Sequence, residues 1–171
     1  MANPQQLAIL KNSIPQWNQW REENLDQPID LTLAPLDETN LAGANLAGAN
    51  LSRAYLTGAN LTGANLAGAN LTGAYLINAC LWAANLTGAD LMGANLIKIN
   101  LSQANLSSTN LTGAELMRAN LTAAHLHNTN FTGAELSEAD LSQTNPAQAN
   151  FTRANLWGAI GHIYQSQLSL E

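Results

Sequence analysis

The chain has 171 residues, of which 46 % are hydrophobic, 11 % charged and 5 % aromatic. This length supports one buried core, and the dominance of Leu, Ala, Asn, Thr and Gly suggests a repetitive sequence. The formal net charge is −6 and no run of Lys or Arg exists, which argues against nucleic acid as a direct ligand, because phosphate neutralisation requires a concentrated basic surface.

The N-terminal segment, residues 1–28, predicts a cap of two short helices. Asn3 and Pro4 form a typical helix start, and Ser13 would begin a second helix because Pro15 interrupts the first. Apolar residues at helical spacing would cover the structure that follows: Leu7, Leu10, Ile14, Trp17 and Trp20.

Residues 29–159 contain a five-residue repeat. A centre residue, usually Leu or Phe, recurs at every fifth position from Leu31 to Leu156, and a small residue stands two positions before it. A period of five fits neither a helix nor a flat strand. If the chain turns a corner after every repeat, both residues point inward. Four such sides would close a coil of 20 residues that stacks at about 4.8 Å, although the period of five does not itself fix the number of sides. We therefore expect an all-β solenoid, a parallel β-helix of about six coils.

The repeats resemble a known family. The stretch ANLAGANLSRAYLTGANLTGANLAGANLTGAYL is similar to the pentapeptide-repeat family, whose unit is a small residue, Asn or Asp, Leu or Phe, Ser or Thr, and a variable residue that is often Gly. The resemblance covers about 125 residues and implies a right-handed, four-sided β-helix and a bacterial protein. It also implies a helical segment before the repeats, because many members carry a W-N-x-W-R stretch there, here residues 17–21.

Two places depart from the repeat. Pro146 occupies a centre position and removes a backbone N–H from the ladder, so we expect a local bulge or defect near the last complete coil. Residues 160–171 follow the repeats, and we expect them to form a C-terminal lid or tail because a stack of coils exposes strand edges at its ends. The apolar residues of this segment are Ile160, Ile163, Tyr164, Leu168 and Leu170.

Few residues are candidates for catalysis or metal binding. Outward side chains on a convex rod diverge, whereas catalysis requires convergent groups in a concavity. His125 and His127 flank a centre and face outward, but no third ligand is placed to complete a metal site. Cys80 has no base beside it, which predicts an inert thiol. We therefore expect no enzyme activity, no cofactor and no metal.

The compartment is also suggested by the sequence. The single cysteine excludes an internal disulfide framework and is typical of a reducing compartment. No apolar stretch approaches the roughly 18–20 residues of a membrane span, and the N-terminus lacks the pattern of a signal peptide. We expect a cytoplasmic protein without membrane contact.

One outer side is richer in large apolar residues than the others. Along its centres, from Leu56 to Leu156, the residue after the centre is large and apolar at four of six positions. Contiguous exposed apolar residues mark a protein-contact surface. We call the predicted surface the apolar stripe, and its residues are Tyr55, Tyr75, Ile77, Trp82, Ile97, Met117 and Trp157. Charged residues beside it predict a small ion-pair network: Lys98, Arg118, Glu115, Glu135 and Glu138.

The leading hypothesis is a non-enzymatic protein-interaction scaffold whose partner is an unknown protein or a second copy. The resemblance also implies an alternative, because some family members mimic DNA and protect type II topoisomerases. The repeats from Leu31 to Leu156 hold seven acidic and four basic residues, a net charge of −3, whereas duplex DNA carries about one negative charge per 1.7 Å. This low density disfavours DNA mimicry. A remote alternative is ice binding through an outward column of Thr72, Thr112, Thr132 and Thr152.

Overall fold

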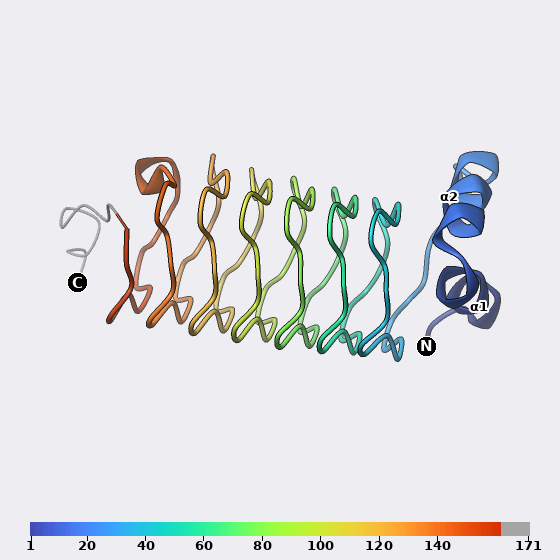
Figure 1. Ribbon diagram of the computed structural model, residues 1–171, viewed down its shortest axis with the longest axis horizontal. Coiled ribbons are helices and arrows are strands. Elements are labelled where there is room, and N and C mark those ends of the chain that lie inside the picture. Colours follow the sequence, from blue (N-terminus) through green and yellow to red (C-terminus); the bar gives the residue numbers. More distant parts are fainter. Residues whose placement is uncertain (162–171) are drawn as a thin grey trace.

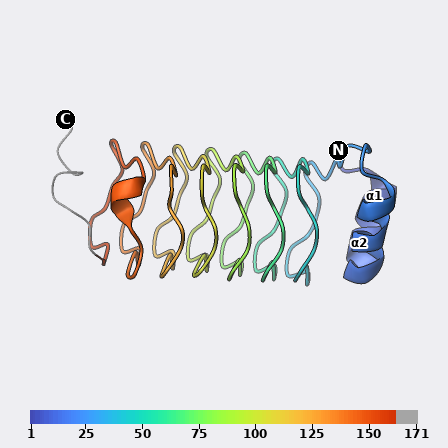
Figure 2. The same cartoon turned by 90° about the horizontal axis from the view of Figure 1, so that it is seen from above.

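The computed structural model describes residues 1–161 and shows a rod of stacked coils. Helices α1 (Pro4–Asn12) and α2 (Ile14–Glu23) lie at one end of the rod, and the 3-10 helix η1 (Pro146–Gln148) interrupts the coils near the other (Figure 1). Seen from above, the coils follow one another along a single axis (Figure 2). Among residues 1–161, no helix combines the length and apolarity needed to cross a membrane.

The two predicted helices are confirmed, and each starts at a side-chain cap. Asn3 Oδ1 accepts hydrogen bonds from the N–H groups at positions 5 and 6, and Pro4 follows as the first helical residue. Ser13 Oγ accepts from the N–H of Gln16 at 3.3 Å. Because Pro15 cannot donate a backbone hydrogen bond, the chain leaves α1 at Asn12 and begins α2 in a new direction.

The repeat region closes a coil every 20 residues. The parallel bridges, from Asp30–Asn50 to Asp140–Ile160, join residues 20 apart and fall immediately before the centres. A turn separates successive bridges, so each coil has four sides. Each side is too short to contain more than an isolated bridge, which is why the rod contains no long strand among its described residues.

Each regular side of the coils ends in a turn with one residue at positive φ. In the turn from Leu41 to Ala44, the Ala44 N–H donates to the Leu41 carbonyl at 3.0 Å, and Gly43 has a φ of 69°. A single positive φ at the third residue is typical of a type II turn, which favours glycine. Nevertheless, fourteen non-glycine residues adopt a similar φ, including Ala83 at 54°. Stacking therefore imposes the turn even where the residue type disfavours it.

The Asn that precedes most centres accepts a hydrogen bond from a backbone N–H that the neighbouring coils do not pair. Of the five N–H groups in residues 49–53, three donate to carbonyls of neighbouring coils and one closes a turn. The fifth, that of Ser52, donates to Asn50 Oδ1 at 3.1 Å. The same local bond joins Thr132 to Asn130. This arrangement explains the repeated Asn or Asp, because a short side-chain carbonyl reaches the N–H two residues later.

The core consists of the centre residues and the small residues two positions before them. The centres from Leu31 to Leu121 have no exposed surface, and Phe131 stacks on Phe151 with ring centroids 4.8 Å apart. Thr109 and Thr129 replace the usual Ala in this interior. Their hydroxyls donate to carbonyls at 2.8 Å, which satisfies the buried polar groups.

The ladder is interrupted at η1. His125 forms a bridge with Asn105 in the preceding coil, but no bridge joins His125 to Asn145 among the described residues. Pro146 is buried like other centres, and its ring prevents it from donating to the ladder. Pairing resumes where the N–H of Asn128 donates to the Gln148 carbonyl at 2.8 Å. The irregularity expected at Pro146 is thus a single 3-10 turn.

Helix α2 contacts the exposed edge of the first coil through side chains. Trp17 Nε1 donates to the Asn45 carbonyl at 2.9 Å, and Arg21 Nη2 donates to the Ala47 carbonyl at 3.0 Å. Trp17 is fully buried. Burial lowers the pKa of the Arg21 guanidinium, since desolvation disfavours the charged form. The W-N-x-W-R stretch therefore pairs edge groups that a preceding coil would otherwise pair.

Helix α1 contacts the same edge on another side. Gln6 is buried, and its Nε2 donates to the Pro28 carbonyl at 2.9 Å while its Oε1 accepts from the Asp30 N–H at 2.9 Å. The Asn3 N–H donates to the Asp30 carbonyl at 2.7 Å. Leu10 is buried as well. Three of the predicted apolar helix residues are only partly buried against the core: Leu7, Ile14 and Trp20.

Candidate interaction surface

The centre of the apolar stripe follows one backbone ladder. The N–H of Asn78 donates to the Ile97 carbonyl at 3.0 Å, and that of Lys98 donates to the Met117 carbonyl at 2.9 Å. Ile77, Ile97 and Met117 therefore stand at the same position of three successive coils. Met117 is 37 % exposed, and both isoleucines are partly exposed. The ladder brings these three side chains into one outward column.

Two stacked tyrosines lie in the neighbouring column, which precedes the centres, in the coil of Ile77 and the coil before it. The rings of Tyr55 and Tyr75 are nearly parallel, with an interplanar angle of 6° and centroids 5.4 Å apart. Both side chains are exposed. They occupy the position before the centre, where other repeats have Asn. Because Tyr55 offers no such acceptor, the Thr57 N–H donates to Asp37 Oδ1 of the preceding coil at 3.1 Å. The coil spacing favours such stacking because it matches the separation of offset aromatic rings.

Two members of the predicted stripe lie away from this column. Trp157 is 72 % exposed, but the nearly buried Ser137 stands between it and Met117 in the same column. Trp82 is exposed on the next side of the coil, whose centre is Leu81. The structure therefore stacks Tyr55 on Tyr75 and aligns Ile77, Ile97 and Met117 in one column, with Trp157 beyond Ser137 in that column and Trp82 on the next side.

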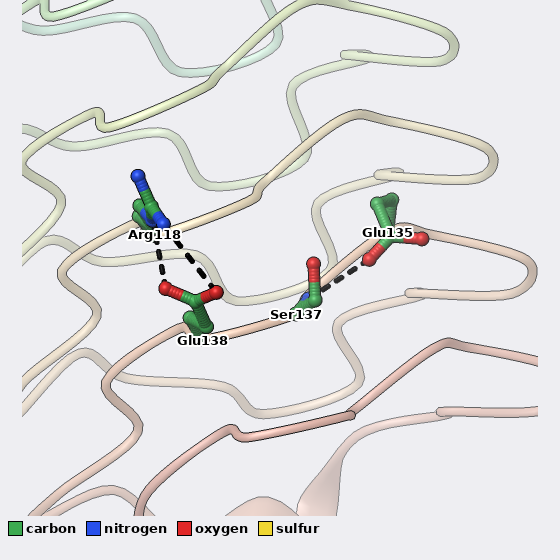
Figure 3. Close-up of polar contacts among 4 residues, drawn as sticks. All are labelled: Arg118, Glu135, Ser137 and Glu138. Atoms are coloured by element: carbon green, nitrogen blue, oxygen red, sulfur yellow. Dashed lines mark hydrogen bonds and ion pairs between the residues drawn. The ribbon is translucent and has the colours of Figure 1, made fainter.

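The predicted ion-pair network contains one ion pair. Arg118 Nε lies 2.7 Å from Glu138 Oε2, with both side chains exposed (Figure 3). The hydrogen bond lowers the pKa of Glu138 and raises that of Arg118. No other ion pair forms among residues 1–161, so the expected participation of Lys98 and Glu115 was wrong. Solvent screens such an exposed pair, so it adds little to stability.

Glu135 has a different role from the one expected. Its Oε1 accepts from the Ser137 N–H at 3.0 Å (Figure 3), and its carboxylate also accepts from Asn155 Nδ2. The hydrogen bonds from Ser137 and Asn155 lower the pKa of Glu135. Glu135 thus replaces the usual Asn as the acceptor of the local backbone bond.

The threonine column does not present free hydroxyl donors. The hydroxyls of Thr112, Thr132 and Thr152 donate to the Asn side chain two residues earlier at 2.6 to 2.7 Å. Thr72 Oγ1 donates to Asp90 Oδ2 at 3.3 Å. Because the protein itself uses these donors, the column is poorly suited to ordering a water lattice.

Metal-ligand and thiol candidates are sparse in the part of the chain that the structure describes. Within residues 1–161, His, Cys, Asp and Glu form no group of three or more that would hold a metal ion. Cys80 is partly exposed, and its Sγ lies 3.4 Å from Thr62 Oγ1 and 3.8 Å from Asn100 Nδ2. These neighbours are hydrogen-bonding groups of the Asn and Thr columns and provide no general base.

Two cavities were not foreseen from the sequence. One of about 450 Å³ lies between the α1–α2 junction and the first coil, beside Asn40. The other, of about 460 Å³, lies at the interrupted ladder, and its lining includes Ser107, His125, His127, Gln143, Asn145 and Gln148. Pro146 was the available sequence signal for the second cavity, but its spatial relation to the two histidines appears only once the coils are stacked.

Comparison with protein families supports the repeat assignment. A family model described as pentapeptide repeats matches residues 34–73, 69–107, 99–137 and 129–160, with 8 copies. No curated protein matches the chain.

Several solved structures are similar to this chain. Rfr23, a pentapeptide repeat protein from the cyanobacterium Cyanothece 51142, is 35 % identical over 54 % of this chain, with a TM-score of 0.45; the match spans 59 % of Rfr23. A trypsin-treated variant of QnrB1, described as a plasmid-mediated fluoroquinolone resistance protein, is 23 % identical, with coverage of 82 % of this chain and 83 % of QnrB1 and a TM-score of 0.57. The likeness to QnrB1 concerns the fold alone and agrees with a right-handed, four-sided β-helix.

Proposed function

Because the chain belongs to the pentapeptide-repeat family, we propose that it is a non-enzymatic scaffold that binds a protein, either a partner or a second copy, through the apolar stripe. The observation that carries this proposal is the exposed column of Ile77, Ile97 and Met117 beside the stacked Tyr55 and Tyr75. Aromatic residues and Met are enriched at protein interfaces, where apolar contacts and lost water provide affinity. A rigid rod would present this column without reorganisation.

The test replaces two apolar side chains of the column with carboxylates. Ile97→Glu combined with Met117→Glu is expected to abolish capture of a partner from the source lysate, or to lower the oligomer mass in light scattering, while circular dichroism stays unchanged. Met92→Glu is the matched control, because Met92 also follows a centre and is exposed, but on another side. Equal behaviour of the double variant and the wild type would remove the stripe as a binding surface.

A second candidate is a DNA-mimic protein that modulates or protects a type II topoisomerase. The fold-level likeness to QnrB1, a fluoroquinolone resistance protein, favours testing it. The net charge of −3 over the repeats opposes it, because a mimic must reproduce the charge density of duplex DNA. Supercoiling by DNA gyrase should be unaffected by micromolar protein, with or without a fluoroquinolone; inhibition or protection would reverse this order of preference.

The proposed scaffold divides the chain into an N-terminal cap and a repeat region. In this organisation, residues 1–28 act as an N-terminal cap on a β-helix of about six coils, residues 29–159. Support comes from the bonds that Trp17, Arg21 and Gln6 make to edge groups of the first coil. Most of the expected lid lies outside the described residues. A closed N-terminal edge would favour contact through the sides of the rod.

A further inference from the structure

The strongest unassigned feature is the cavity at the interrupted ladder. His125 and His127 both line this cavity of about 460 Å³ and alternate with the buried Leu126. His125 precedes Leu126 and His127 follows it at the start of a turn; both side chains are exposed, and His127 Nε2 lies 3.2 Å from Asn128 Nδ2. The two imidazoles therefore border one space from one side of a coil.

The next coil contributes oxygen donors to the same space. Gln143, Asn145 and Gln148 line the cavity, and each carries a side-chain amide oxygen. In a regular coil, residue 145 would bridge to residue 125, as Asn105 does from the other direction, but η1 replaces that bridge. The departure of the chain at Pro146 leaves room between two histidines and three amides.

We propose that this cavity is a binding site for a divalent transition-metal ion, held by the imidazoles of His125 and His127 together with an amide oxygen from the next coil and water. Imidazole is a preferred ligand of Cu²⁺, Ni²⁺ and Zn²⁺, and a site without carboxylates or thiolates is poorly suited to Ca²⁺ or Mg²⁺. Among these ions, Cu²⁺ binds most tightly to a given nitrogen and oxygen ligand set. The proposed site is independent of the apolar stripe.

His125 and His127 both replace residues that are usual in the repeat, so the usual residues can serve as conservative substitutions. Asn105 occupies the position of His125 in the preceding coil, and Thr87 occupies the position of His127 two coils earlier. His125→Asn and His127→Thr therefore restore residues that the fold already accommodates. Both variants should retain the circular dichroism and melting temperature of the parent protein in the absence of metal.

The experiment uses the full chain without an affinity tag, in a Cys80→Ser background, so that the thiol does not bind the metal. Cu²⁺ is titrated by calorimetry in the presence of glycine as a weak competing chelator. We expect one ion per chain, and at least about tenfold weaker binding in each of His125→Asn and His127→Thr, since each loses one arm of the chelate. His162→Gln, which alters the remaining histidine, is expected to bind as the background does.

Electron paramagnetic resonance of the Cu²⁺ complex gives a second readout. The background protein should show hyperfine coupling to two imidazole nitrogens, and each single histidine variant should show coupling to one. Binding that survives both substitutions unchanged, binding that is lost only in His162→Gln, or a spectrum without imidazole coupling would overturn the proposal.

Discussion

Asn18 and Asn45 join the N-terminal helices to the first coil, because Asn18 Oδ1 accepts from the Asn45 backbone N–H at 2.8 Å. The Asn18 amide also donates to the Gly43 carbonyl at 3.0 Å. In the interior of the rod, the N–H before each centre donates to a carbonyl of the previous coil, as Asn65 does to Ala44. Asn18 thus supplies with a side chain what a preceding coil would supply with its backbone.

Replacing Asn18 should destabilise this end of the rod. Asn18→Ala removes both bonds and leaves the Asn45 N–H without its acceptor, so we expect a loss of about 1–3 kcal/mol in the free energy of unfolding. Urea denaturation followed by circular dichroism measures the change. Gln19→Ala is the control, because the side chain of Gln19 is exposed and bonds only within α2 to Glu23.

Two substitutions at Trp17 distinguish the contribution of packing from that of hydrogen bonding at the same junction. Trp17→Phe keeps an aromatic ring but removes the donor to the Asn45 carbonyl, which predicts a loss of about 1–3 kcal/mol. Trp17→Ala also empties a fully buried site and should cost about 3–5 kcal/mol. In denaturant titrations, an unchanged free energy of unfolding in Trp17→Phe would show that the indole bond contributes nothing, and equal losses in the two variants would show that the ring kept by Phe contributes nothing.

The positive-φ turns predict substitutions with opposite signs. Gly63 has a φ of 62° and open space where a Cβ would stand, so Gly63→Ala tests backbone strain alone and should destabilise the rod by about 1 kcal/mol. Ala83, with a φ of 54°, should behave in reverse, with Ala83→Gly stabilising by up to about 1 kcal/mol. Melting temperatures that move in the same direction for both variants would contradict this account of the turns.

Pro146 interrupts an otherwise continuous ladder. Pro146→Leu restores the residue type of the other centres and the missing N–H, and we expect it to raise the free energy of unfolding by about 1–3 kcal/mol. The same substitution should allow a regular turn beside His125 and weaken Cu²⁺ binding. Denaturation without metal and titration with metal measure the two effects separately.

The loss of folding stability at acidic pH depends partly on the carboxylate of Glu135. Its folded-state pKa lies below the ordinary value of 4.5, so its contribution to stability is present above that pH and is lost as the pH falls through the lowered pKa. Glu135→Gln keeps an oxygen acceptor for the Ser137 N–H but removes the titration. Melting temperatures between pH 3 and pH 7 should therefore fall less steeply in this variant; identical slopes would exclude the contribution.

Much of the fold follows from sequence periodicity, whereas the edges and the cavities do not. Leu51 and Ala54 are assigned to the interior by their position in the repeat, because every coil places them equivalently. Gln6 and Arg21 are buried polar residues, and their need to pair backbone groups arises only when the helices meet the first coil. A pattern of apolar residues contains no information about such partners.

The candidate surface was predicted only in part for a similar reason. The 20-residue period places Ile77, Ile97 and Met117 in one column, and it also aligns Tyr55 with Tyr75. The separation of Trp157 from this group depends on how deeply Ser137 is buried, which its residue type does not specify. The period likewise brings Arg118 and Glu138 together, but not the other charged side chains.

A coil that closes after 20 residues makes distance along this chain equivalent to an angle around the rod. Inserting one five-residue repeat between Ile77 and Ile97 would keep all later centres inside, yet it would rotate everything beyond the insertion by a quarter turn. Inserting four repeats would restore the original orientation and move the later residues along the axis by one coil. The composition of the outer surface can therefore be rearranged by whole repeats while the core stays filled.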